Sequence, residues 1–272
     1  MIWKKQEPGM DDLHKPKTVS SADGLPIVYE VRGTGNPTLI FVHGWSCDRR
    51  YWQEQLEPLS QVFQVVAIDL AGHGDSGLGR GYWTMASFGD DVAAVVNELS
   101  LDQVVLIGHS MGGDVILEAA RRLPARVAGL VWLDAYKRLS TPRTPEQIQQ
   151  ILTPFRADFE NAVRAFFGGM FPPDANPALV EWVTADMAAA PPAVALAALE
   201  ATITYDREVP LALQELQLPL VAINSAVPPT DTESLARYGV RAVCLTGVGH
   251  FLMLEDPERV NQQLLTAVKE FA

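Results

Sequence analysis

The chain has 272 residues, of which 48% are hydrophobic, and 33 Asp and Glu against 21 Lys and Arg give a formal net charge of −12. This acidic balance argues against nucleic-acid binding, because contacts with a phosphate backbone need clustered Lys and Arg. No run approaches the roughly 18 apolar residues of a membrane helix, and the charged first residues lack the apolar centre of a secretory signal. Two cysteines, Cys47 and Cys244, make neither a disulfide framework nor a zinc site. We therefore expect a soluble cytoplasmic protein without membrane insertion.

Two strands are predicted first, at Lys17–Ser21 and Pro26–Arg32, with the turn Ala22-Asp23-Gly24 between them. Beyond them the pattern changes to short, continuous apolar runs. Strands of a parallel sheet have this pattern because helices cover both faces of the sheet. Five such runs and a last strand candidate follow: Thr38–Val42, Val62–Ile68, Gln103–Ile107, Val127–Leu133, Leu220–Ile223 and Arg241–Leu245.

Segments of helix length separate these runs. Met85–Leu99 and Met111–Leu123 carry apolar residues at helical spacing. Repeated alternation of strand and helix predicts an α/β fold with a mostly parallel sheet.

Residues 136–210 interrupt the alternation, since they contain helical segments and no strand. Thr144-Pro145-Glu146-Gln147 has the composition of a helix start with a capping box. Apolar residues follow in three groups: Phe155, Phe159, Val163, Phe167 and Met170; Val180, Trp182, Val183 and Met187; and the Ala-rich Pro191–Thr204. We interpret 136–210 as a helical cap inserted into a core formed by 1–135 and 211–272. Some of its aromatic residues are expected to line an apolar pocket and others to attach the cap to the core.

The strongest local motif is Gly108-His109-Ser110-Met111-Gly112, of the form G-x-S-x-G. It lies between a predicted strand and a predicted helix, which is the context that a nucleophile elbow requires. A serine hydroxyl needs an adjacent base to act as a nucleophile. Of the five histidines, His14, His43, His73, His109 and His250, only His250 follows the last predicted strand, in a glycine-rich loop. Ser110 and His250 are therefore the predicted nucleophile and general base.

The turn His43-Gly44-Trp45 ends the third predicted strand. A turn at this place can supply one backbone N–H group of an oxyanion hole, and the residue after the nucleophile supplies the second. We expect these donors to be the N–H groups of Trp45 and Met111, with His43 holding the loop rather than transferring protons.

With these residues the chain resembles the α/β-hydrolase superfamily, in particular its capped serine esterases and N-acyl homoserine lactonases. The matching elements span most of the chain: His43-Gly44-Trp45, Asp69–Ser76, the elbow at Ser110, and Gly249-His250-Phe251 followed by Glu255-Asp256-Pro257. The resemblance implies an eight-stranded sheet with the helical cap inserted after strand six. It gives Asp69–Ser76 a structural role only.

The acid of the triad departs from the commonest pattern of this superfamily, in which it follows strand seven. The expected position falls near Pro228, and Asp231 lies slightly beyond it, where it could instead cap a helix. Asp134 ends strand six, a position that some branches use. We favour Asp134, and Asp231 and Glu233 remain alternatives.

These residues predict acyl transfer to Ser110 and hydrolysis by water, without a metal or cofactor. The expected substrate is a carboxylic ester or lactone with a mainly apolar acyl part, and the resemblance adds an acyl homoserine lactone as one example. Cofactor-free ring-cleaving dioxygenases resemble the chain through Gly44-Trp45 and Asp134, although their elbows usually lack Gly-His-Ser-Met-Gly. A hormone-type receptor of the same fold is a further, non-enzymatic alternative.

Overall fold

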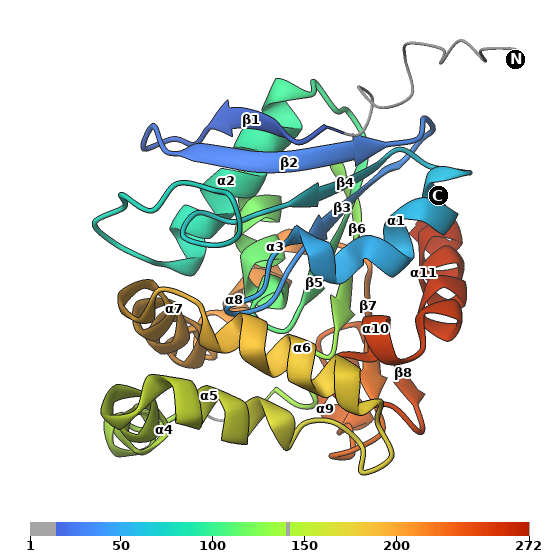
Figure 1. The fold of residues 1–272 in the computed structure, drawn as a ribbon. Helices are drawn as coiled ribbons and strands as arrows, with labels where there is room; N and C mark the ends of the chain where they lie inside the picture. Colours follow the sequence, from blue (N-terminus) through green and yellow to red (C-terminus); the bar gives the residue numbers. More distant parts are fainter. Residues whose placement is uncertain (1–14, 140–141, 272) are drawn as a thin grey trace, which may run out of the picture.

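The computed structural model describes residues 15–139 and 142–271, and its centre is one eight-stranded sheet (Figure 1). The strand order is β1-β2-β4-β3-β5-β6-β7-β8. Pairs β1/β2 and β2/β4 are antiparallel, and all later pairs are parallel. This confirms the predicted fold class. The strands are β1 Lys17–Ser20, β2 Pro26–Arg32, β3 Thr38–Val42, β4 Val65–Ile68, β5 Val104–His109, β6 Val127–Leu133, β7 Leu220–Ser225 and β8 Val240–Leu245.

The continuous apolar runs are the central strands because helices bury both faces of the sheet. Every residue of β3, β4 and β5 is buried. The helices α2 (Met85–Glu98) and α3 (Gly112–Arg122) pack on one face, and α1 (Gln53–Ser60) and α11 (Pro257–Phe271) cover the other (Figure 1). Shorter helices are η1 Arg49–Trp52, α9 Thr232–Ala236 and α10 Leu252–Glu255.

The fourth strand starts later than predicted. Val62 is exposed, and its N–H donates to the carbonyl of Leu59 in the turn that ends α1. The ladder begins only at Val65, which pairs with Leu39 of β3. The apolar side chains that precede it misled the prediction.

Five helices occupy the chain between β6 and β7: α4 Pro145–Ala157, α5 Phe159–Gly168, α6 Pro177–Ala188, α7 Pro192–Tyr205 and α8 Val209–Leu216. Thr144 and Gln147 form the predicted capping box at the start of α4. The predicted apolar group from Phe155 to Met170 is divided between two helices, because Asp158 ends α4 and its carboxylate caps α5 through the N–H of Asn161. The sequence did not predict α8, which packs against α3.

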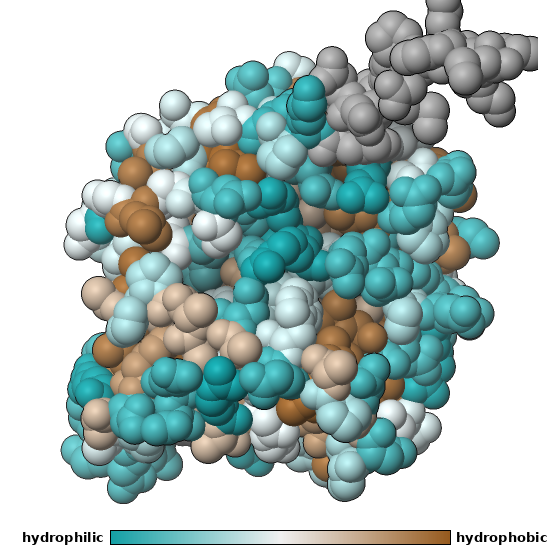
Figure 2. All heavy atoms as spheres, in the orientation of Figure 1, coloured by the Kyte–Doolittle hydropathy of each residue, from teal (hydrophilic) through white to brown (hydrophobic). Residues whose placement is uncertain are grey.

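The helices α4–α7, here called the inserted helices, lie beside the carboxyl ends of the parallel strands (Figure 1). The face drawn in Figure 2 is largely hydrophilic, and a pale brown area lies where Figure 1 places the Ala-rich α7. Within 15–139 and 142–271 no single helix has the length and apolar composition of a membrane span. The helices α6 and α7 have that length and apolar composition only when they are counted together, and the chain bends by 100° between them.

Candidate active site

Ser110 stands on the sharp turn between β5 and α3. Its φ of +51° is in the left-handed region, which a residue with a side chain rarely adopts, and its N–H donates to the carbonyl of Leu133 at 3.0 Å. A Cβ atom on Gly108 would lie 2.2 Å from the carbonyl oxygen of Gly112. The turn can therefore be this tight only with glycine at 108, as a nucleophile elbow requires.

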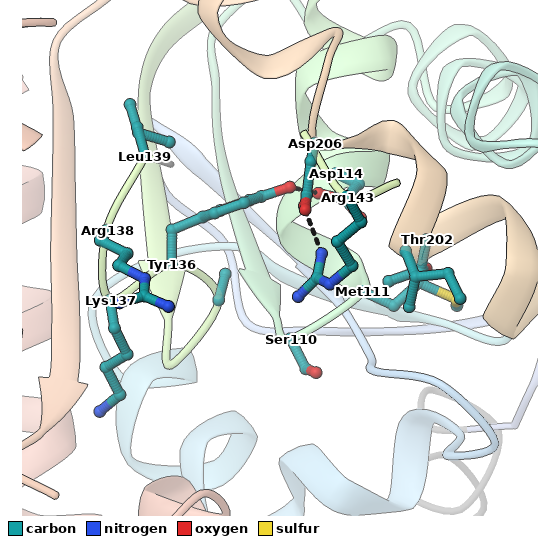
Figure 3. A pocket seen from close by; sticks show the side chains of 12 residues that line it. Ser110, Met111, Asp114, Tyr136, Lys137, Arg138, Leu139, Arg143, Thr202 and Asp206 are labelled. Carbon is teal, nitrogen blue, oxygen red and sulfur yellow. Dashed lines mark hydrogen bonds and ion pairs between the residues drawn. The ribbon is translucent and has the colours of Figure 1, made fainter. Parts of the chain in front are cut away.

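The side chain of Ser110 faces a cavity of about 280 Å³ (Figure 3). Its hydroxyl makes no hydrogen bond to any residue in 15–139 or 142–271. It is thus free to meet a molecule that enters the cavity.

His250 lies in the loop after β8, and hydrogen bonds to two other segments of the chain hold this loop in place. Its Nδ1 donates to Oδ2 of Asp134 at 2.8 Å, and its backbone N–H donates to the carbonyl of Met170 at 3.0 Å. A Cβ on Gly249 would lie 2.2 Å from that same carbonyl oxygen, so the close approach needs glycine there. Because Nδ1 carries the proton, Nε2 is the nitrogen left to act as a base.

Asp134, directly after β6, is the acid that the fold brings to His250. Its φ is +47°, a second left-handed residue at a strand end. Oδ1 accepts hydrogen bonds from the N–H of Ser225 at 2.7 Å and pairs with Nζ of Lys137 at 2.6 Å. Burial alone would raise the pKa of Asp134, but the hydrogen bond and charge of His250, together with Lys137, lower it to about 2. The carboxylate is therefore ionised at neutral pH.

The two alternative acids lie elsewhere. Asp231 caps α9 by accepting the N–H of Ser234 at 3.0 Å, and Glu233 is exposed on the same helix. Neither carboxylate bonds to an imidazole among the described residues.

The two predicted oxyanion donors are available. Neither the N–H of Trp45 nor that of Met111 donates a hydrogen bond within 15–139 and 142–271. The turn at Gly44 packs closely on the elbow, since a Cβ on Gly44 would lie 3.3 Å from Cβ of Ser110. His43 binds backbone groups of its surroundings, accepting from Leu70 at 3.0 Å and donating to the carbonyl of Gly44 at 2.8 Å.

Trp45 also joins the core to the inserted helices. Its ring packs on Phe155, Phe159 and Phe167, and its indole N–H donates to the carbonyl of Ala195 at 2.7 Å. These three aromatic residues thus attach the helices to the core. A second cavity, of about 490 Å³, borders Asp134 and His250 and is lined by apolar residues that include Met170, Phe171, Val227 and Val248.

Three residues to which the sequence motifs gave no role hold this site together. His109 donates from Nε2 to the carbonyl of His250 at 2.9 Å, and burial lowers the pKa of His109 to about 3, so the ring is neutral. Glu255 accepts the N–H groups of Gly249 at 2.8 Å and Phe251 at 3.1 Å. Lys137 pairs with Asp134. His109 and Glu255 lie in the quoted motifs, Gly108–Gly112 and Glu255-Asp256-Pro257, but Lys137 lies in none. His73 lies buried outside the site, and His14 lies outside the described residues.

Residues 39–263 match the profile of the alpha/beta hydrolase family. The chain belongs to the alpha/beta hydrolase family. The matched range includes every candidate site residue named above.

Individual relatives of this alpha/beta hydrolase include esterases and a lactone-degrading enzyme. A thermophilic esterase from Thermogutta terrifontis superposes with a TM-score of 0.79 at 27% identity, over 94% of this chain and 99% of that one. Est816, an N-acyl homoserine lactone degrading enzyme, shares the fold with a TM-score of 0.78 at 24% identity, over 92% of this chain and 99% of that one. The pimeloyl-[acyl-carrier protein] methyl ester esterase of Sodalis glossinidius is 26% identical over 86% of this chain and 94% of its own.

Other curated relatives match only in part. An acetyltransferase component of an acetoin cleaving system from Cupriavidus necator is 34% identical, and a putative non-heme haloperoxidase from Mycobacterium phage D29 is 39% identical. Each alignment covers 44% of this chain, and the chain spans 32% and 44% of these relatives' lengths.

Proposed function

We propose that the protein is a serine hydrolase that cleaves a carboxylic ester or lactone through an acyl-enzyme. The observation that carries this proposal is the contact of 2.8 Å between His250 Nδ1 and Asp134 Oδ2, behind a serine on a strained elbow. A buried carboxylate at Nδ1 fixes the imidazole tautomer and stabilises the imidazolium that forms during attack.

In the proposed mechanism Ser110 Oγ attacks the substrate carbonyl while Nε2 of His250 takes its proton. The C–O bond to the leaving alcohol breaks as His250 returns that proton to the leaving oxygen. Water then attacks the acyl-enzyme with His250 again as base, which releases the acid and restores Ser110. The free N–H groups of Trp45 and Met111 are the proposed donors to the oxyanion, and loss of one such donor typically costs about 3–4 kcal/mol of transition-state stabilisation. Ser110 must turn toward His250 for the first step, as is common in unliganded enzymes.

The inserted helices are proposed to act as a cap over this site, and the substrate's acyl part to be mainly apolar. The second cavity supports both proposals, because Met170 and Phe171, in the loop between α5 and α6, line it together with His250. The esterase and lactonase relatives are consistent with a small ester or lactone.

A panel of p-nitrophenyl esters and acyl lactones tests the proposal with wild-type protein and Ser110→Ala. The expected result is hydrolysis by the wild type and loss of nearly all of it in the variant, whose circular dichroism stays unchanged. Hydrolysis that persists in Ser110→Ala would refute the nucleophile. A single burst without further turnover would instead favour a receptor.

A further inference from the structure

The cavity in front of Ser110 is lined by charged groups, which an apolar acyl chain does not explain. The cavity is lined by Ser110 and Met111 together with charged or acidic residues (Figure 3). These are the three cations Lys137, Arg138 and Arg143 and the carboxyl groups of Asp114 and Asp206. Figure 3 shows the guanidinium of Arg143 between the carboxylate of Asp206 and Ser110. A protein with a net charge of −12 thus places cations beside its candidate nucleophile.

The two carboxyl groups do not neutralise this lining. Asp114 is buried and accepts a hydrogen bond from the hydroxyl of Tyr136 at 2.5 Å. Burial raises the pKa of Asp114 well above its usual value, because it disfavours the charged form of this carboxyl group. Asp206 remains, and it pairs with Arg143.

The cations differ in how far they are engaged. Lys137 is bound to Asp134 and to the hydroxyl of Ser225. Arg143 makes one ion pair, to Asp206, and its side chain is 39% exposed, so further N–H groups of its guanidinium are unpaired in the described part of the chain. Arg138 is exposed and forms no hydrogen bond or ion pair there. A guanidinium with free N–H groups is well suited to bind a carboxylate through two parallel hydrogen bonds.

We propose that this cavity binds an ionised carboxylate of the substrate, with Arg143 as its principal partner and Arg138 at the rim. The preferred substrate is then an ester or lactone that carries a second, free carboxylate several carbon atoms from the scissile carbonyl. This inference rests on the proposed function, and it adds an anionic end to a chain that can otherwise be apolar.

Two esters of equal shape test the proposal. Mono-4-nitrophenyl adipate carries the free carboxylate, and 4-nitrophenyl 6-methylheptanoate replaces it with an isopropyl group. The ratio of their kcat/KM values should favour the adipate in the wild type and fall by about tenfold or more in Arg143→Met, since a charge-assisted pair is lost. Arg156→Met is the matched control, because Arg156 lies on the exposed side of α4, paired with Glu200, and does not line the cavity. It should leave the ratio unchanged.

Asp206→Asn separates recognition from a merely structural ion pair. If Arg143 binds the substrate, removal of its competitor should raise kcat/KM for the adipate ester and hardly change that for the neutral ester. If the Arg143–Asp206 ion pair only stabilises the fold, Arg143→Met and Asp206→Asn should lower kcat/KM for both esters alike, which would overturn the inference.

Calorimetric binding of adipate itself gives a readout without turnover. The wild type and Arg156→Met should bind adipate competitively with ester, and Arg143→Met should bind it about tenfold more weakly. Adipate binding without Ser110-dependent hydrolysis would refute the proposed function and leave the anion site standing. Hydrolysis of both esters would refute the anion site alone if adipate does not bind and Arg143→Met leaves the ratio of the two kcat/KM values unchanged.

Discussion

Nζ of Lys137 lies 2.6 Å from Oδ1 of Asp134, on the carboxylate oxygen opposite to the one that accepts from His250. The same ammonium donates to the hydroxyl of Ser225 at 2.8 Å. A cation at this place draws negative charge away from the imidazole side of the carboxylate. Lys137 therefore reduces the stabilisation that Asp134 offers to a protonated His250.

Replacement of this cation should change the pH dependence of hydrolysis. In Lys137→Met we expect the acid limb of the kcat/KM profile to move to higher pH, because loss of the cation that lowers the pKa of Asp134 favours proton uptake by the Asp134–His250 pair. The other titratable groups around His250, namely His109 and Glu255, are unchanged. Lys137→Arg keeps the charge and should shift the limb less. A Lys137→Met profile of lower amplitude but identical midpoint would show that Lys137 only supports the loop.

The choice of triad acid is tested by two asparagine substitutions. Asp134→Asn keeps the shape but allows the wrong tautomer of His250, an effect of about 10⁴-fold in kcat in the best-studied triad. Asp231→Asn should keep most activity and change stability little, because asparagine caps a helix about as well as aspartate does. Steady-state kinetics with urea unfolding of both variants checks this. An inactive Asp231→Asn beside an active Asp134→Asn would reverse the assignment.

The sequence predicted the sheet well because its strands are continuous apolar runs, which periodicity detects locally. It predicted Ser110 for a similar reason, since the elbow is contained in five consecutive residues between a strand and a helix. The break at Asp158 was missed, because the apolar spacing continues across it and only the capping bond to Asn161 separates α4 from α5.

The acid of the triad could not be identified from local sequence in this way. The sequence around an aspartate that follows a strand is the same whether it faces a histidine or caps a helix. Only the order β6-β7-β8 in the sheet brings Asp134 to His250, which follows β8. His109 contacts a segment more than 80 residues away, the carbonyl of His250, and Lys137 joins Asp134 to the hydroxyl of Ser225, which is also more than 80 residues away. Such contacts leave no local pattern.

Buried histidines should make stability depend on pH. Burial, helped by the charge of His43, lowers the pKa of His73 to about 3, whereas a histidine in the unfolded chain titrates near about 6.5. Between these values only the unfolded chain binds the proton, so stability falls as the pH falls, by up to about 1.4 kcal/mol per pH unit for this group.

His73→Gln removes that linkage. The free energy of unfolding lost in the variant should be largest at pH 7 and should shrink by about 1.4 kcal/mol per unit between pH 6 and pH 4. Urea unfolding of both proteins at several pH values measures the difference. A loss that stays constant across this range would contradict a depressed pKa for His73.

The central claim, that Ser110 is a nucleophile activated by His250, is tested most directly by covalent labelling. Wild-type protein is treated with a dialkyl fluorophosphate, and its mass, the modified peptide and the remaining esterase activity are followed together. The account predicts one phosphoryl group per chain, located on Ser110, with activity lost in proportion, and no labelling of Ser110→Ala. Labelling in His250→Gln should be strongly slowed. Full loss of activity with the label on another residue, or an unlabelled wild type that still hydrolyses esters, would contradict the claim.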